Sequence, residues 1–213
     1  FAVTDVSRDK SRLPVIQQQL IAEKPDLVIT WGTSVSRGIL GTIAEHGTKS
    51  ALGNIPAIFM IVADPVGSKL VTSYEASGRP LVSGVRNRVP EEVQLRLLFE
   101  YFRPSKMGVV NDPNELNSTL NTNSLHAISD KLSFELIDQV YETDAEGKID
   151  VDQIPIALAK LKEKGVEALY VGSSSFNLEH RAAFVEAATA LDLPVFSAYT
   201  QMVKDAGALM AIG

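Results

Sequence analysis

The side chains of this sequence that are best suited to chemistry are polar groups that directly follow short apolar runs. Most are neutral hydroxyl or amide groups, with one carboxylate and two aromatic rings among them. The candidates are Trp31, Thr33, Ser34, Asp64, Asn111, Asn117, Ser118, Ser173, Ser174 and Tyr199. Hydroxyl and amide groups bind small molecules through hydrogen bonds, and aromatic rings stack on ligands. The set therefore predicts a binding site for a small polar or zwitterionic molecule.

Most of these residues also have a purely structural interpretation. The hydroxyl groups that could simply cap the helix that follows them are those of Thr33, Ser34, Ser173 and Ser174. Asp64 ends an apolar run, where a carboxylate must be capped, paired or bound to a ligand cation. Pro65 follows it, so a turn or a helix N-terminus is an equally good interpretation there. Trp31 could likewise be half-buried packing.

Known catalytic and metal-binding patterns fit this sequence poorly. Gly32–Ser36 approaches the Gly-x-Ser-x-Gly nucleophile elbow, but Ser36 stands where the second glycine is needed. The histidines fall in expected helices rather than at strand ends, where a general base would be expected. Glu142–Ile149 imitates the start of a calcium loop, but Gln153 replaces the bidentate glutamate. We therefore expect no catalytic residue, no metal site, no cofactor and no enzyme activity.

Composition narrows the class of protein further. The 213 residues carry a net charge of −6 without a Lys/Arg-rich run, so no nucleic-acid partner is expected. Apolar runs such as Ile55–Ala63 are far shorter than the ~20 residues of a spanning helix, so no transmembrane segment is expected. The absence of cysteine excludes disulfides and thiolate metal sites. An apolar fraction of 45% is typical of a folded globular protein.

Short aliphatic and β-branched runs alternate with segments of helical periodicity. The predicted strands are Ala2–Val6, Leu27–Trp31, Ala57–Val62, Leu81–Val85, Met107–Asn111, Glu135–Tyr141, Ala168–Gly172, Val195–Ala198 and Ala208–Ile212. The predicted helical stripes pass through Leu13, Ile16, Leu20 and Ile21, and through Leu178, Ala182, Val185, Ala188 and Leu191. A further helix is predicted over Glu91–Phe102. The alternation predicts an α/β fold with largely parallel sheets flanked by helices.

Two parts of the sequence resemble each other. Glu23–Ser34 aligns without a gap on Glu163–Ser174, and both read as helix end, breaker, strand, then a glycine followed by two hydroxyl residues. A second match follows, between Asn54–Phe59 and Asp192–Phe196. The repetition predicts two similar α/β lobes with a joint near Val85–Pro90.

The predicted elements place the candidate side chains at or just beyond the carboxyl ends of strands. Ligands of open parallel sheets bind there, where helix N-termini present free backbone N–H groups. If the two lobes face each other, both glycine-hydroxyl turns line one shared cleft. This cleft between the lobes is the expected ligand site.

Several runs, in order over nearly the whole chain, point to a known family. They are Lys24–Ser34, Ile55–Phe59, Ala63–Val71, Val82–Val85, Pro104–Asn111, Asn114–Ser118, Val166–Val171 and Gly207–Leu209. Together they resemble the substrate-binding proteins of ABC transporters, in the branch that includes tryptophan- and tyrosine-binding members. The block Asp64-Pro65-Val66-Gly67 after an apolar strand is the most specific of them.

The resemblance implies a type I periplasmic binding protein-like fold. Its N-terminal lobe would be residues 1–86, without the first strand and helix, and its second lobe residues 87–213. It also implies a small-molecule ligand, an ABC permease as partner, and a periplasmic or surface-anchored location. The chain carries no export signal, so it resembles a fragment. Gly172–Ser175 departs from the Asp-Asn turn of relatives that bind aromatic amino acids, so tryptophan or tyrosine does not carry over.

Two functions of different classes are consistent with these residues. The first is an extracytoplasmic solute-binding protein of an ABC importer, which binds a small polar molecule such as an amino acid or a related metabolite. The second is an α/β enzyme or a ligand-sensing regulator with a related two-lobed core, which would use Asp64 and a hydroxyl group. A DNA-binding head or a catalytic pair would favour the second, and the sequence shows neither.

Overall fold

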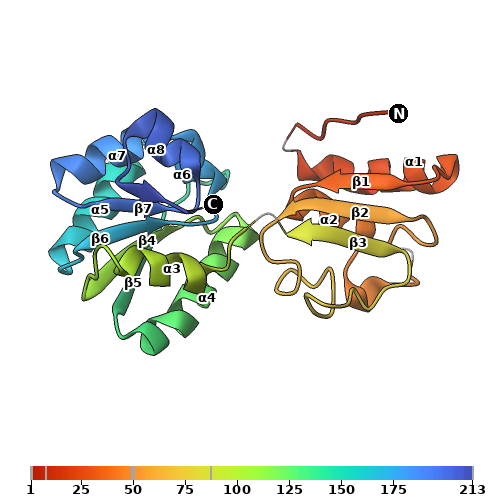
Figure 1. Ribbon diagram of the computed structural model, residues 1–213. Coiled ribbons are helices and arrows are strands. Elements are labelled where there is room, and N and C mark those ends of the chain that lie inside the picture. Colours follow the sequence, from red (N-terminus) through yellow and green to blue (C-terminus); the bar gives the residue numbers. More distant parts are fainter. Residues whose placement is uncertain (1, 8, 49–50, 87, 213) are drawn as a thin grey trace. The chain divides into compact units, whose positions relative to one another are not determined.

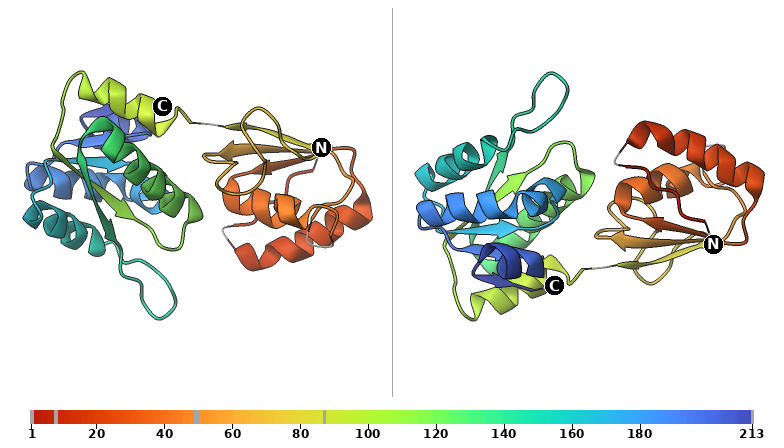
Figure 2. Two further views of the ribbon diagram at one scale, coloured as in Figure 1. Left: turned by 90° about the horizontal axis from the view of Figure 1, so that it is seen from below. Right: turned by 90° about the horizontal axis from the view of Figure 1, so that it is seen from above.

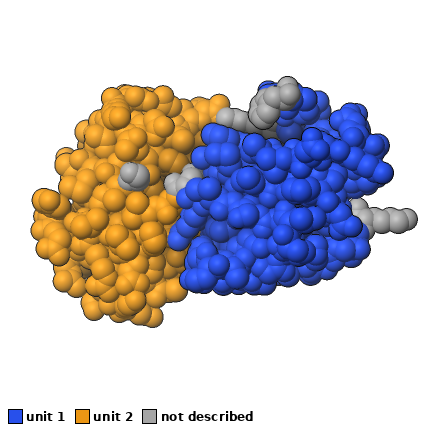
Figure 3. All heavy atoms as spheres, turned by 45° about the vertical axis from the view of Figure 1, so that its right-hand side comes forward, with its two compact units in different colours: residues 1–87 blue, residues 88–213 orange. Residues whose placement is uncertain are grey.

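Two compact units make up the protein, residues 1–87 and 88–213, which Figure 3 shows in different colours. The computed structural model describes residues 2–7, 9–48, 51–86 and 88–212. Each unit is built around its own parallel sheet with helices against it (Figure 1). The α/β class with parallel sheets flanked by helices, predicted from the sequence, is confirmed.

Unit 1 contains a three-stranded parallel sheet whose strands lie in chain order. The strands are β1 (Val28–Trp31), β2 (Ala57–Val62) and β3 (Val82–Arg86). The helices are α1 (Leu13–Glu23) and α2 (Thr33–Leu40), with the short 3-10 helices η1 (Lys10–Arg12) and η2 (Ile43–Glu45). The apolar stripe predicted through Leu13 and Leu20 is therefore part of a helix, as expected.

The side chains of β1 alternate between a buried and an exposed face. Val28 and Thr30 are buried, whereas Ile29 and Trp31 are 46% and 64% exposed. The buried set joins the core that Ile39 of α2 also enters. Helices α1 and α2 lie behind the sheet in the view of Figure 1. The other face of β1 therefore carries apolar side chains that the described residues leave accessible.

Unit 2 contains a five-stranded sheet in which every pair of neighbouring strands is parallel. The strands are β4 (Lys106–Asn111), β5 (Glu135–Val140), β6 (Ala168–Val171), β7 (Val195–Ser197) and β8 (Met210–Ala211). The helices are α3 (Glu91–Phe99), α4 (Leu116–Leu132), α5 (Gln153–Glu163), α6 (Ser175–Glu179), α7 (Arg181–Ala190) and α8 (Thr200–Ala206).

Both faces of the unit 2 sheet are covered. All of β6 is buried, and its side chains divide between two cores. Ala168 and Tyr170 enter the core that α3 and α4 complete, while Leu169 and Val171 enter the core of α5 and α7. Figure 1 shows α3 and α4 on one side of the sheet. A strand buried on both faces must be apolar throughout, which explains the continuous run Ala168–Val171.

The strand order of unit 2 is β5-β4-β6-β7-β8. The chain moves from β4 outward to β5, then returns past β4 to β6 and continues in the opposite direction. The order therefore reverses between β4 and β6. In doubly wound sheets the connections on either side of such a reversal leave over opposite faces, and a crevice opens at the carboxyl ends of the two strands.

Two predicted elements differ from the structure near their ends. The prediction of a strand over Ala2–Val6 is wrong: these residues pair with no strand among the described residues, and Val3 is 83% exposed. An extended segment without a neighbour cannot form the ladder of hydrogen bonds that defines a strand. The helix predicted over Glu91–Phe102 ends at Phe99. Pro104 disfavours helical backbone at the residue before it, which limits how far the helix could extend.

The predicted stripe from Leu178 to Leu191 spans two helices rather than one. Helix α6 ends at Glu179 and α7 begins at Arg181, with His180 between them at φ −96° and ψ 29°. This break shifts the helical phase. Ala182 is consequently exposed, and Phe184 is buried in the core in its place.

The segment between β5 and α5 leaves unit 2 as a long loop (Figure 2). It starts at Tyr141, which is buried, and closes a tight turn in which the Asp144 N–H donates to the Lys148 carbonyl at 2.9 Å. The Asp144 side chain accepts two further backbone N–H groups, from Glu146 and Lys148. A carboxylate that fixes its own turn accounts for the calcium-like spacing without a metal ion.

Gly84 provides a test of packing in unit 1. It lies opposite Phe59 on the neighbouring strand, and a Cβ atom at this position would overlap the buried Phe59 ring. We expect Gly84→Ala to lower the free energy of unfolding by about 1–3 kcal/mol, because the ring has no space to move. Ser83→Ala, at the exposed neighbouring position, should change it by less than about 0.5 kcal/mol. Urea unfolding followed by circular dichroism measures both values. Equal stabilities of the Gly84→Ala and Ser83→Ala variants would contradict the prediction.

Candidate ligand-binding site

Polar side chains gather at the carboxyl ends of β4, β6 and β7 in unit 2. Asn111 ends β4, Ser173 and Ser174 follow β6, and Tyr199 follows β7. The first two of these strands flank the reversal of strand order. This edge of the sheet is where open α/β folds bind their ligands.

Arg88 occupies the centre of this group. Its side chain is only 5% exposed. Its Nη1 donates a hydrogen bond to the Ser173 hydroxyl oxygen, and its guanidinium lies over the Tyr199 ring, 5.4 Å from the ring centre. The arginine thereby joins the turn after β6 to the turn after β7. A cation over an aromatic face is attracted by the π electrons, more strongly when both are shielded from water.

Glu91 and Asn121 lie next to Arg88 and Ser173 and are hydrogen-bonded to each other. The Asn121 Nδ2 donates to the Glu91 Oε1 at 3.1 Å, and the Asn121 Oδ1 accepts the Ser173 N–H at 3.3 Å. The Arg88 Nε lies 3.9 Å from the same Glu91 oxygen. Glu91 and Asn121 are themselves buried, on α3 and α4. Hydrogen-bonded side chains of this kind position Ser173 without relying on solvent.

The glycine of the repeated motif has a different role in each unit. Gly172 sits where a Cβ atom would overlap the Asn121 amide, so only glycine lets this amide reach Ser173. Gly32, its counterpart in unit 1, has open space around it but a φ of +87°. That backbone conformation favours glycine at the start of α2. The same sequence pattern thus reflects close packing in one unit and backbone conformation in the other.

The Tyr199 hydroxyl is held in its neutral form. Burial raises its pKa above the ordinary value of a tyrosine, the Arg88 charge works against this shift, and the Glu115 carboxylate adds to it. Glu115 is fixed near the turn after β6, because its carboxylate accepts both the N–H and the hydroxyl of Ser175, at 2.7 and 2.9 Å. At neutral pH the phenol is therefore a hydrogen-bond donor or acceptor rather than an anion.

Two of the predicted site residues in unit 2 have structural partners. The Ser174 hydroxyl accepts the Asn177 N–H at 3.1 Å and caps α6. The Ser118 hydroxyl accepts the Asp112 N–H at 2.9 Å and fixes the loop after β4. Ser174 thus makes the capping interaction that the sequence offers as the structural alternative, whereas Ser118 holds a loop rather than a helix end. These contacts do not use the remaining hydrogen-bonding capacity of either hydroxyl.

Asn111 and Asn117 lie close to this loop and differ from Ser118. Each has a buried side-chain oxygen, Oδ1, for which the described residues provide no hydrogen-bond donor. A buried acceptor without a partner is costly, unless a ligand or water supplies a donor. These two oxygens are therefore candidates for ligand contacts at the end of β4 and the start of α4.

The predicted site residues of unit 1 lie at the carboxyl end of its own sheet. Trp31 is the exposed last residue of β1, and Ser34 is partly exposed in the first turn of α2. Thr33 is buried, and its hydroxyl oxygen has no hydrogen-bond partner within the described chain. A role in ligand binding for these three stays a prediction.

Asp64 has two hydrogen-bond donors within unit 1. Its Oδ1 accepts the Gly67 N–H at 2.8 Å and the Tyr74 hydroxyl at 3.1 Å. Its backbone oxygen accepts the Ser68 N–H at 3.0 Å, and the residues that follow form successive turns rather than a helix. The carboxylate thus fixes the turn after β2. Its predicted contact with a ligand cation stays a prediction.

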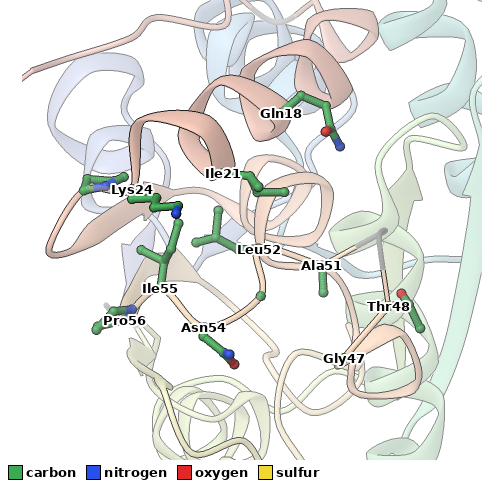
Figure 4. Close-up of a pocket in the computed structure, with 12 residues that line it drawn as sticks. Gln18, Ile21, Lys24, Gly47, Thr48, Ala51, Leu52, Asn54, Ile55 and Pro56 are labelled. Carbon is green, nitrogen blue, oxygen red and sulfur yellow. The ribbon is translucent and has the colours of Figure 1, made fainter.

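A pocket of about 750 Å³ lies elsewhere in unit 1 (Figure 4). It is lined partly by Lys24 and Pro25, which precede β1, and by Ile55 and Pro56, which precede β2. It therefore opens at the amino ends of the strands, away from Thr33 and the other candidates. Ile21, Leu52 and Ile55 make much of its wall apolar.

Two searches bear on other kinds of site. No cluster of three or more His, Asp or Glu side chains in residues 2–7, 9–48, 51–86 and 88–212 could hold a metal ion. No helix in those same ranges has the length and apolar character needed to cross a membrane.

Sequence reasoning overlooked Arg88, Glu91 and Asn121. Arg88 stands in the predicted joint, Glu91 resembles an ordinary first-turn acid, and Asn121 is one of several polar residues in α4. The sequence carries one weak signal, the glycine at position 172 directly after an apolar run, and the structure shows that this glycine does not adopt a positive φ. A glycine with no backbone reason for being there indicates the close approach of another group.

The fold defines a class: an α/β protein of two units, each built around a parallel sheet with polar side chains at the carboxyl ends of its strands. The model of the family described as ABC transporter substrate binding protein matches residues 2–213. The chain therefore belongs to that family, and the resemblance noted in its sequence is confirmed.

Individual proteins are similar to this chain in sequence or in fold. The Tyrosine-binding protein of Clostridioides difficile is 28% identical over 150 residues, covering 66% of this chain and 41% of that protein. A conserved domain protein from Vibrio cholerae shares the fold with a TM-score of 0.70 at 24% identity, over 93% of this chain and 61% of that one. An ABC domain from Streptococcus pneumoniae, solved in complex with L-Trp, shares it with a TM-score of 0.72 at 21% identity, over 96% of this chain and 64% of that one. This chain thus spans less than two thirds of each of them.

The loop after β4 separates structural roles from ligand-binding roles. We expect Ser118→Ala to lower the free energy of unfolding by about 1–3 kcal/mol, because the buried Asp112 N–H loses its acceptor. Asn117→Ala removes an oxygen that has no partner in the described chain and should cost less than about 1 kcal/mol. Urea unfolding of both variants gives the comparison. A larger loss for Asn117→Ala than for Ser118→Ala would show that these roles are reversed.

Proposed function

We propose that this chain is part of an extracytoplasmic solute-binding protein of an ABC importer. It binds a small polar molecule, such as an amino acid or a related metabolite, and delivers it to an ABC permease in the membrane. The protein works in the periplasm or anchored at the cell surface. Membership of the substrate-binding family supports each part of this proposal.

The position of Arg88 is the structural observation that supports this proposal. A buried, charged side chain, Arg88, lies against Ser173 after β6 and Tyr199 after β7, at the carboxyl ends of two neighbouring strands. Burying a charge without full pairing is costly, so a protein keeps such a group where it binds something. The group lies where α/β folds hold small ligands.

The chemistry of the group favours binding over catalysis. The Ser173 hydroxyl oxygen accepts a hydrogen bond from an arginine, whereas a nucleophile needs a base that removes its own proton. Tyr199 is kept neutral by burial, and Asn121 contacts Ser173 through the backbone N–H of the serine, as an amide that cannot act as a base. We therefore propose that the protein is not an enzyme.

The ligand itself is left to experiment. One relative is named for tyrosine and another was solved with L-Trp. Gly172, Ser173 and Ser174 replace the Asp-Asn turn that the resemblance leads one to expect after β6. The turn in this chain carries hydroxyl groups where a carboxylate and an amide are expected, so the solute need not be aromatic. The predicted cleft between two lobes stays a prediction.

A binding screen tests the proposal. The intact protein is screened by thermal shift against amino acids and other small metabolites, and hits are measured by calorimetry. We expect at least one solute to bind and to be recovered unchanged, as judged by mass spectrometry. Chemical conversion of a bound solute would favour the enzyme alternative instead.

Ser173→Ala and Ser105→Ala form a matched pair for such a solute. Ser173 lies after β6 and holds Arg88, whereas Ser105 is exposed at the amino end of β4. We expect Ser173→Ala to weaken binding by about tenfold, the value of one hydrogen bond, and Ser105→Ala to leave the affinity unchanged. Equal affinities in calorimetry would remove the turn after β6 from the binding site.

A further inference from the structure

We infer that Arg88 is the receptor for an oxyanion group of the solute, a carboxylate or a group of similar charge and shape such as phosphate. This inference rests on the proposed function and names the class of solute. It assigns the binding energy to a residue that precedes α3, rather than to the hydroxyl turns suggested by the sequence. All the residues that form this receptor belong to unit 2.

Two neighbouring side chains fix the orientation of the Arg88 guanidinium. Its Nη1 donates to the Ser173 hydroxyl oxygen, and its central carbon, Cζ, lies over the Tyr199 ring, 5.4 Å from the ring centre. Nε and Nη2 are buried and have no hydrogen-bond partner of good geometry within the described chain. The guanidinium also lies near the buried Tyr170 hydroxyl, where its charge opposes the rise that burial causes in the pKa of that phenol. These two nitrogens form one edge of the guanidinium, and this edge binds a carboxylate or phosphate through two parallel hydrogen bonds.

Buried guanidinium N–H groups without acceptors lower the stability of the folded protein. A buried N–H group without an acceptor costs about 1–3 kcal/mol, and more when it carries charge. Arg88 leaves two such atoms without acceptors while its side chain is only 5% exposed. The folded protein recovers this cost when a ligand supplies two acceptor oxygens. A neutral solute with one carbonyl would satisfy only one of them.

Glu91 is the acid that lies beside Arg88. Its Oε1 is 3.9 Å from the Arg88 Nε, too far for a hydrogen bond. The same oxygen accepts the Asn121 amide at 3.1 Å, which ties it to α4. Glu91 therefore balances part of the arginine charge without occupying the free edge. The site keeps a directional donor pair for a second anion.

The side chains around Arg88 hold it in a fixed orientation. Ser173 is held by Asn121, and Asn121 is packed against Gly172, so the acceptor of the Nη1 hydrogen bond cannot easily move. The Tyr199 ring, on the opposite turn, limits rotation of the guanidinium. An arginine whose orientation is set before the ligand arrives loses little entropy on binding.

Simple oxyanions test this inference without knowledge of the natural solute. The melting temperature of the intact protein, freed of bound solute by dialysis, is measured at pH 7 in sodium acetate, in sodium phosphate and in sodium chloride of equal ionic strength. We expect acetate or phosphate to raise it by about 2–4 °C relative to chloride. Acetate tests the planar carboxylate, and phosphate tests the tetrahedral anion.

Variants assign the effect to Arg88. Arg88→Gln should lose the anion-dependent shift, and Arg88→Lys should keep only part of it, because lysine retains the charge but not the two-pronged edge. Arg96→Gln is the matched control, since Arg96 is an exposed arginine on α3 paired with Glu92. It should respond to acetate and phosphate as the unaltered protein does. Circular dichroism of each variant confirms that it is folded.

The outcomes are distinct. A shift that is present in the unaltered protein and in Arg96→Gln, but lost in Arg88→Gln, supports the inference. No shift with either anion, or an equal shift in all variants, overturns it. Glu91→Gln separates an internal ion pair from a ligand site: if it abolishes the anion response as fully as Arg88→Gln does, the inference is also overturned.

A failed inference is distinguishable from a failed function. A solute that the screen finds, and that Arg88→Gln binds as tightly as the unaltered protein does, would overturn the role of Arg88 and leave the solute-binding function intact. For a solute that is an acid, its neutral amide gives a second comparison. We expect the unaltered protein to bind the amide at least tenfold more weakly than it binds the acid. We expect Arg88→Gln to bind the amide and the acid with equal affinity.

Discussion

The buried guanidinium of Arg88 is the constraint around which the carboxyl edge of the unit 2 sheet is organised. A charge that is removed from water must be surrounded by groups that partly replace it. Ser173 supplies a hydroxyl oxygen, Tyr199 an aromatic face and Glu91 a nearby carboxylate. Asn121 then holds Ser173 and Glu91 in place, and its approach to the sheet requires a glycine at position 172.

This edge can be shaped so closely because the sheet beneath it is rigid. The strands β4, β6 and β7 are buried on both faces, and helices from two separate cores hold them. Interiors packed to this degree transmit small displacements rather than absorb them. The turns after these strands therefore inherit fixed positions, and side chains far apart in the sequence meet with defined geometry.

Unit 1 has the same kinds of element but a different balance of burial. Its helices cover one face of a three-stranded sheet, and Ile29, Trp31 and Val85 remain exposed. Parallel sheets are normally covered on both faces. Asp64, at its carboxyl edge, is tied into a local turn by Gly67 and Tyr74. The unit 2 edge, by contrast, connects elements that are distant in the chain.

The sequence by itself determined the alternation of strands and helices, the family, and the set of polar residues at strand ends, because these depend on local periodicity and on short motifs. It placed Ser173 and Tyr199 at the edge that the structure describes. It misjudged Ala2–Val6, which has the composition of a strand but no neighbour to pair with among the described residues. Only the tertiary structure decided that Arg88, Glu91 and Asn121 share a site, since the contacts from residues 88 and 91 to residues 121, 173 and 199 depend on strand order and on the closure of α3 and α4 over the sheet. Strand order arises from packing over the whole unit, and no local pattern in the chain records it.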